Sequence, residues 1–170
     1  NVTGMQVFDV TTAASPSLLA TLDTPGTAVG IAVSGNAAYI ADTTSLRVAD
    51  ITTPASPSLI GSLITNATAV AVAGTKAYLL GDSLLKVVDI TTPASPFLVS
   101  TIAASSAQSL AVIGNFVLVS VPATDHTSTT GGVRVYNVTN PASPVFVKLI
   151  IVPGRAGGLS ASGGLAYGGD

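Results

Sequence analysis

Side chains that could carry acid-base or metal chemistry are few in this sequence. All eight acidic residues are aspartates, histidine occurs once, and glutamate and cysteine are absent. The lack of cysteine excludes disulfides, thiolate catalysis and cysteine-ligated zinc. Aspartate can act as an acid, a base or a calcium ligand, so the positions of the aspartates decide which chemistry is open.

Four acidic or amide residues recur at one position of a repeated segment: Asp9, Asp50, Asp89 and Asn137. They are 41, 39 and 48 residues apart. A ring of metal ligands is one interpretation. The structural interpretation is favoured, because Asp or Asn ahead of Thr accepts backbone N–H bonds, and because repeated units hold equivalent residues far apart. We therefore predict that all four residues cap turns and that none holds a metal.

Two further charged series follow the same repeat. Asp42, Asp82 and Asp170 come after short apolar runs, and turn formation explains them better than calcium binding because no Asp-x-Asp-x-Asp loop is present. The basic series is predicted to occupy solvated strand positions, with a shared binding face as the alternative: Arg47, Lys86 and Arg134. We assign no catalytic or cofactor-binding residue.

An insertion of about ten residues interrupts the repeat at residues 122–131, PATDHTSTTG. Asp125, His126 and Thr127 within it are candidate partner contacts, because binding surfaces favour insertions on rigid scaffolds. A plain surface loop is the competing interpretation. A Ser-His-Asp triad is not predicted, because it needs three groups and an oxyanion site converging in space. Asn1, Asn66 and Asn137 begin Asn-x-Thr sequons and are candidate glycosylation sites, unless these matches are accidental.

An internal repeat must position all of these residues. The octapeptide DITTPASP occurs at residues 50–57 and again at 89–96, and related segments occupy residues 7–16 and 135–144. A second marker, usually a glycine followed by a short apolar run, begins at Ser34, Ala73, Ile113 and Ser162. A fixed period near 40 residues is typical of a solenoid or a propeller.

The content of each repeat favours the propeller. Four short apolar runs and no helix-length segment predict four strands, which in the first copy include residues 18–22, 29–33 and 37–41. A glycine opens each two-residue turn, as a type II′ hairpin requires, at Gly35, Gly74, Gly114 and Gly163. The Thr-Thr-Pro-Ala-Ser-Pro segment must be a rigid loop, because proline lacks a donor. The run before each hairpin is large on one face and small on the other, as converging blades require.

We therefore predict an all-β chain, a β-propeller of four-stranded antiparallel blades, with about four blades' worth of strands in one domain or propeller segment over residues 1–170. The strands could close as a four-bladed ring, in which the last two strands join the first two. Alternatively they belong to a ring of about six to eight blades, whose free edges pair with further chain or with a neighbouring subunit. The start at Asn1 inside a repeat favours the larger ring or assembly.

The linked motifs resemble a known family. VFDV, RVADI, KVVDI and RVYNV, each followed by a Pro-Ala-Ser-Pro-like loop and later a Gly-Asn-x-x-Tyr-like hairpin, look like LVIVD repeats over nearly the whole chain. The resemblance implies a β-propeller in a secreted or cell-surface protein of bacteria or archaea. The sequence departs from the pattern at Asn137, at the insertion, and at Ala13 and Ala14, where later copies have Thr-Pro or Asn-Pro.

Composition narrows the function. Only 8% of residues are charged and the net charge is -2, so neither a nucleic-acid surface nor membrane insertion is expected. We predict a non-catalytic scaffold or adhesion propeller, extracellular or at the cell surface, without a cofactor. Its partner would be a protein, a surface polysaccharide or another copy. The alternatives are an intracellular protein-protein adaptor, which normally has a more charged surface, and an enzyme with its site at the propeller mouth, which needs converging acid, base or metal groups.

Overall fold

The computed structural model describes residues 4–122, 130–153 and 157–169, which form fifteen strands and no helix. In chain order the strands are β1 (Met5–Asp9), β2 (Ser17–Leu22), β3 (Gly30–Ser34), β4 (Ala37–Asp50), β5 (Ser58–Ala67), β6 (Ala69–Ala73), β7 (Lys76–Gly81), β8 (Leu84–Asp89), β9 (Phe97–Ala103), β10 (Ser109–Ile113), β11 (Phe116–Val121), β12 (Thr130–Asn137), β13 (Val145–Pro153), β14 (Leu159–Ser162) and β15 (Leu165–Gly168). The predicted all-β class is confirmed.

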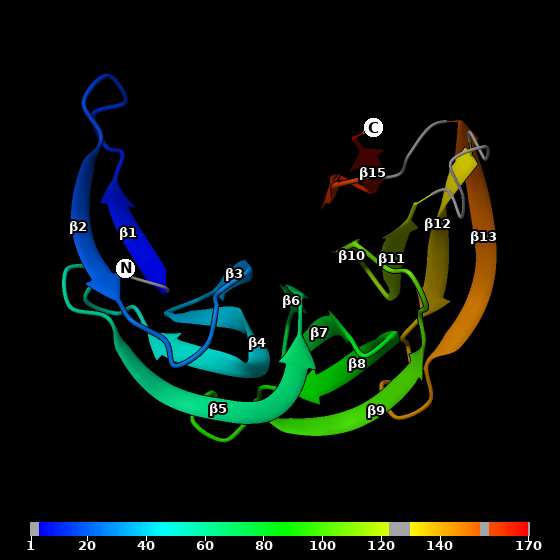
Figure 1. The fold of residues 1–170 in the computed structure, drawn as a ribbon, viewed down its shortest axis with the longest axis horizontal. Helices are drawn as coiled ribbons and strands as arrows, with labels where there is room; N and C mark the ends of the chain where they lie inside the picture. Colours follow the sequence, from blue (N-terminus) through cyan, green and yellow to red (C-terminus); the bar gives the residue numbers. More distant parts are fainter. Residues whose placement is uncertain (1–3, 123–129, 154–156, 170) are drawn as a thin grey trace.

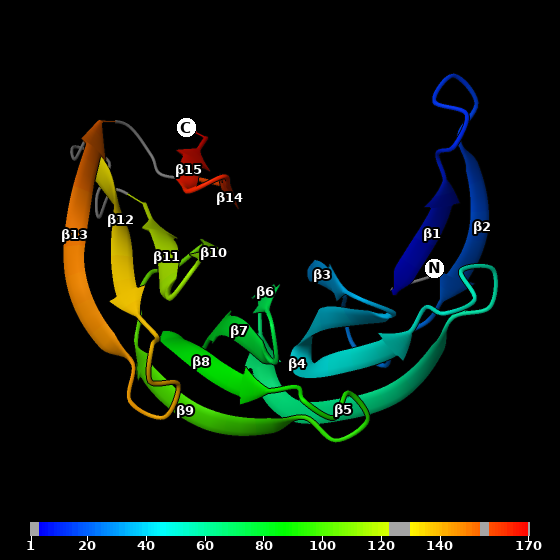
Figure 2. The same cartoon turned by 180° about the vertical axis from the view of Figure 1, so that it is seen from behind.

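The strands form five antiparallel sheets that follow one another along an open arc (Figure 1). We call β1–β2 the first pair, β3–β5 the first unit, β6–β9 the second unit, β10–β13 the third unit and β14–β15 the last pair. In each unit the first strand lies on the inner side of the arc and the last strand on the outer side (Figure 2). The first pair and the last pair lie at the two ends of the arc.

The first unit contains the same chain path as the other two, although β4 is a single 14-residue strand. The Ile51 N–H donates to the Asn36 carbonyl at 2.9 Å, so the two ends of β4 lie side by side. The bend falls at Thr43, whose φ of 41° is the left-handed conformation that a tight reversal needs. The second and third units place separate strands, β7–β8 and β11–β12, along this path.

The hairpins before β4, β7, β11 and β15 are two-residue loops that begin with glycine. Gly35, Gly74 and Gly114 have φ near 55°, as the first position of the predicted turn requires. The fourth hairpin differs, because Gly164 at the second position also has a positive φ, of 84°. That turn is therefore not type II′.

The repeated octapeptide forms a loop that packs each unit on its neighbour. Within the loop the Ser56 N–H donates to the Thr53 carbonyl at 2.8 Å, and the Ser95 N–H makes the equivalent bond to Thr92 at 2.9 Å. The loop of the second unit then rests on β5, where a Cβ added to Gly61 would lie only 2.4 Å from the Pro93 carbonyl oxygen. One unit further on, the Ser100 hydroxyl donates to the Pro141 carbonyl at 2.5 Å. The loop recurs because each junction uses it.

The hydrophobic core lies between neighbouring units rather than inside a single sheet. Large side chains of the innermost strands, such as Val70 and Val72 of β6, pack against the unit before. The small side chains of the same strand, Ala69, Ala71 and Ala73, pack against the unit after. This division confirms the use predicted for the large and small faces. Because each layer is completed by the next unit, the two ends of the arc have incomplete layers.

Candidate functional site at the ends of the arc

The residues predicted as turn caps all bond the residue two positions further on. The carboxylate oxygens of Asp9 and Asp50 accept both the N–H and the hydroxyl of the following Thr, at 2.6 to 2.9 Å. Asp89 accepts the N–H of Thr91 and the Lys76 ammonium, and the Asn137 side-chain oxygen accepts the Thr139 N–H. These bonds lower the pKa of the carboxyls. For Asp89 the bond from Lys76 is the largest cause, with the Thr91 N–H next, and the pKa falls from 3.8 to about 2.

The prediction that the basic series is solvated is wrong for Lys86, whose fraction exposed is 3%. Its ammonium donates to the Thr65 hydroxyl at 2.9 Å, the Asn66 carbonyl at 2.8 Å and the Asp82 carboxylate at 2.7 Å. The end of β5 and the turn between β7 and β8 therefore use all three donors of this lysine. Lys86 thus clamps the end of β5, just before the connection between two units, to that turn.

Of the other two basic residues, Arg134 binds a connecting segment directly and Arg47 lies beside an aspartate that does so. Arg134 donates to the Ser105 carbonyl at 2.5 Å. Arg47 lies 3.5 Å from the Asp42 carboxylate, which is fully buried. Asp42 also accepts the Thr24 hydroxyl and the Gly26 N–H, both at 3.0 Å. Through these contacts Asp42 holds the connection between β2 and β3 against β4.

The remaining candidates lie partly outside the described residues. The partner-contact candidates Asp125, His126 and Thr127, as well as Asp170 and Asn1, cannot be placed for this reason. Of the other sequon residues, Asn66 is exposed and Asn137 is half-buried. Within the described parts of the chain, no three His, Cys, Asp or Glu side chains gather where they could hold a metal ion. The described residues also include no helix long and apolar enough to cross a membrane.

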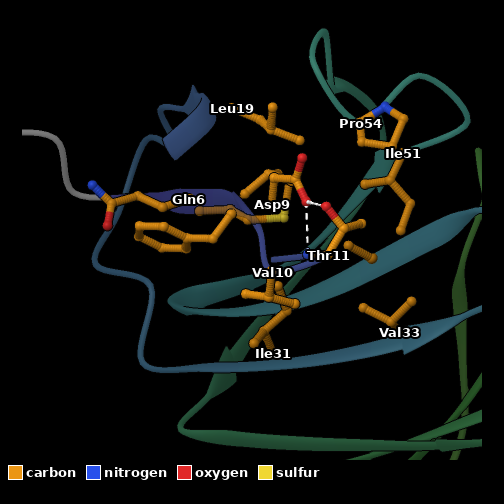
Figure 3. Close-up of a pocket in the computed structure, with 13 residues that line it drawn as sticks. Gln6, Asp9, Val10, Thr11, Leu19, Ile31, Val33, Ile51 and Pro54 are labelled. Carbon is orange, nitrogen blue, oxygen red and sulfur yellow. Dashed lines mark hydrogen bonds between the residues drawn. The ribbon is translucent and has the colours of Figure 1, made fainter. Parts of the chain in front are cut away.

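A hollow of about 490 Å³ beside β1 is the main candidate site. Its apolar wall combines β1 with the exposed face of the first unit, through these side chains: Met5, Val7, Ile31, Val33, Ala38 and Ile51. Figure 3 shows Ile31, Val33 and Ile51 around the hollow and the Asp9–Thr11 bonds near it. Because the lining is mostly apolar, the hollow suits an apolar side chain better than a charged ligand.

The two strands that border the ends of the arc have free backbone edges. In the described part of the chain, β1 pairs with β2 alone and β15 pairs with β14 alone. Leu165 and Tyr167 of β15 are exposed, as are Phe8 and Val10 at the other end. An exposed strand edge with apolar side chains favours pairing with another strand. The arrangement is therefore suited to strand addition.

Sequence reasoning foresaw free edges but missed the hollow. The signal was present in the repeat alignment, where Tyr39, Tyr78 and Tyr167 occupy the same position after the hairpin glycine. The first two are buried between units, with 3% and 5% exposed, whereas Tyr167 is 57% exposed. A difference of this size between repeated tyrosines marks an unfilled junction.

These features define an all-β repeat protein of propeller-like architecture. Residues 25–65 and 66–103 match the LVIVD repeat, and the two matches coincide with the first and second units. The chain therefore contains two LVIVD repeats, which confirms the resemblance seen in the sequence over these residues. A search of curated proteins gives no significant match.

Solved structures support the architecture. The chain is similar to the computationally designed Ika8 protein, with 15% identity and a TM-score of 0.69, over 98% of this chain and 49% of that one. It is also similar to the designed Ika4 protein, with 15% identity and a TM-score of 0.63, over 86% of both chains. A functionally unknown protein from Desulfotomaculum acetoxidans DSM 771 matches at 15% identity and a TM-score of 0.67, over 87% of this chain and 53% of that one. At these identities the likeness concerns the fold alone.

Proposed function

We propose that this chain is a non-catalytic scaffold module, extracellular or at the cell surface, which works by assembly through its free strand edges. Each unit corresponds to one propeller blade, and the first and last pairs are complementary halves of a further blade. The chain thus carries about four blades' worth of strands within a larger closed ring.

The observation that carries the proposal is the pair of free edges, β1 and β15, each beside exposed apolar side chains. Natural β-proteins normally protect such edges with charge, proline or a covering segment. Here the neighbouring side chains are apolar, including Phe8, Val10, Leu165 and Tyr167. Pairing with another strand would explain why these edges carry apolar rather than protective side chains.

The low charge supports an extracellular setting. With 8% charged residues, far below the roughly 25% of an average domain, the polar surface is made mainly by Ser, Thr, Asn and Gly. A surface of this kind has little electrostatic repulsion to oppose close assembly. Its few charges are also largely used internally, as the buried Lys86 and Asp42 illustrate.

Two experiments test the proposal. Fractionation of the source cells should place the protein in the medium or the cell envelope, whereas a cytoplasmic location would favour the adaptor alternative. The purified chain, immobilised on a sensor, should bind itself, an envelope protein or a wall polysaccharide. As a control, the same surface is prepared with chain unfolded in urea. Absence of binding to all three would refute the scaffold function.

A further inference from the structure

We infer that a second copy of this chain closes the arc, with β15 of one copy paired to β1 of the other and Tyr167 seated in the hollow beside β1. The inference deepens the proposed scaffold function and rests on it, because it identifies the partner of the same free edges. Its evidence comes from the junctions that the chain forms within itself.

The first argument is the position of the repeated tyrosine. At the junction of the first and second units, Tyr39 is buried in a cluster with Leu46 and Val48 of its own unit and with residues of the next unit. At the following junction Tyr78 is buried in the same way, against Leu85 and Val87. Tyr167 has the equivalent position in the last pair. It lies exposed because no further unit covers it among the described residues.

The second argument is the composition of the hollow. Six residues of the first junction belong to the cluster of Tyr39 or pack against it: Leu46, Val48, Val70, Val72, Ala77 and Ile90. In the repeat alignment their counterparts are Met5, Val7, Ile31, Val33, Ala38 and Ile51, and all six line the hollow. The hollow is therefore the junction that holds a tyrosine elsewhere, with its tyrosine missing. Tyr167 is the one repeated tyrosine of the described chain that remains exposed.

A third contact forms on the opposite face of the same strands. Phe8 of β1 is 53% exposed, whereas its counterparts Val88 and Tyr136 are buried at the formed junctions. At the second junction Tyr136 packs with Ile102 of β9. The counterpart of Ile102 in the third unit is Ile150, which is also exposed. Docking two copies end to end would bring Phe8 of one onto Ile150 of the other and bury both.

The formed units also give the strand register. In the second unit Tyr78 lies opposite Val87 and Leu79 lies opposite Lys86. The same register places Tyr167 opposite Val7, and Gly168 opposite Gln6. Paired positions on antiparallel strands have Cα atoms about 4.5 to 5.5 Å apart, which is within reach of a disulfide.

The geometry of the arc favours a second copy over closure within one chain. β1 and β15 belong to separate sheets at opposite ends of the arc, and both views show them apart (Figures 1 and 2). The alignment that uses 98% of this chain covers only 49% of the designed Ika8 protein, so the arc has the extent of about half of that chain. Two copies joined head to tail through identical contacts would make a closed ring.

The test uses the absence of cysteine in the chain, which makes engineered cysteines unambiguous. Gln6→Cys and Gly168→Cys are prepared as two separate 170-residue proteins. A Cβ at Gly168 meets only the Leu159 side chain, at 3.5 Å, so the substitution is tolerated. The two proteins are mixed under mild oxidation and analysed by non-reducing electrophoresis. Each protein oxidised alone is the matched control, because a head-to-tail contact places residue 6 beside residue 168 and not beside itself.

The inference predicts a disulfide-linked dimer in the mixture and much less in either protein alone. It also predicts that Tyr167→Ala weakens dimer formation at least about tenfold by sedimentation, as expected for a buried aromatic contact. Ile64→Ala, which shortens a side chain that is exposed on β5, should not. A third protein carries both Gln6→Cys and Gly168→Cys. No crosslink in the mixture, together with an internal disulfide in this double variant, would overturn the inference and show closure within one chain. No crosslink but binding to an envelope component would overturn it and leave the scaffold function standing.

Discussion

A single methyl group at residue 61 tests how the repeated loop joins neighbouring units. In Gly61→Ala the new Cβ would lie 2.4 Å from the Pro93 carbonyl oxygen and 3.0 Å from the Ala94 backbone. Ordinary contacts between carbon and oxygen begin near 3.3 Å, so the loop or β5 must move by about 1 Å. Neither side of the contact is a flexible side chain.

Overpacking of this kind lowers the free energy of unfolding by about 1 to 3 kcal/mol. Replacing a glycine offsets up to about 1 kcal/mol of this loss, because it reduces the conformational entropy of the unfolded chain. We expect a net loss of about 1 to 2 kcal/mol in the free energy of unfolding. For a chain of this size each kcal/mol lowers Tm by about 2 to 4 °C, so Tm should fall by about 2 to 8 °C.

The assay is a thermal melt followed by circular dichroism, with Gly158→Ala as the control. A Cβ at Gly158 meets no atom within 4 Å, so this variant should melt within about 2 °C of the parent. If Gly61→Ala melts at or above the parent temperature, the Pro-Ala-Ser-Pro loop does not rest on β5. The account of the unit junctions would then be wrong.

Three further variants test the charged residues. Asp89 has a folded pKa of about 2, below its ordinary 3.8, so its contribution to stability is complete above about pH 5 and is lost between about pH 4 and 2. In urea titrations Asp89→Asn should therefore lose less stability than the parent over that interval. Equal losses would contradict the bond to Lys76. Lys86→Ala leaves the Asn66 carbonyl without its donor and should lower the free energy of unfolding by about 2 to 4 kcal/mol in the same titration. A decrease under about 0.5 kcal/mol would show that the clamp does not form. Lys148→Ser should strengthen dimer formation several-fold in sedimentation, because the equivalent residues at formed junctions are small, Gly61 and Ser100; weaker association would mean that Lys148 contributes to the contact.

The sequence predicted the strands and turns well, because their signals are local. Gly35 and its equivalents mark hairpins through their own backbone freedom, and Asp50 bonds a residue only two positions away. The proline-rich loop was likewise predicted from the lack of a donor. What could not be predicted was that β4 continues unbroken through its bend, because the sequence pattern there indicates two separate strands, as in the other units.

Burial of the charged residues also escaped prediction, since it depends on contacts between distant parts of the chain. Lys86 looks like an exposed strand residue until the Asn66 carbonyl, 20 positions earlier, is placed over it. Asp42 is covered by Thr24 and Gly26 in the same manner. The hollow beside β1 is of this kind as well, because its walls come from β1 and from Ile51, which are joined only through tertiary packing.

The mass of the purified chain in solution, measured by light scattering after gel filtration, tests the central claim most directly. One copy has a mass of 16.7 kDa, and head-to-tail closure by a second copy predicts a particle of twice that mass. Tyr167→Ala should return the particle to the mass of one copy. A compact, cooperatively melting particle of 16.7 kDa at every concentration tested would contradict the claim, because the free edges would then be satisfied within one chain.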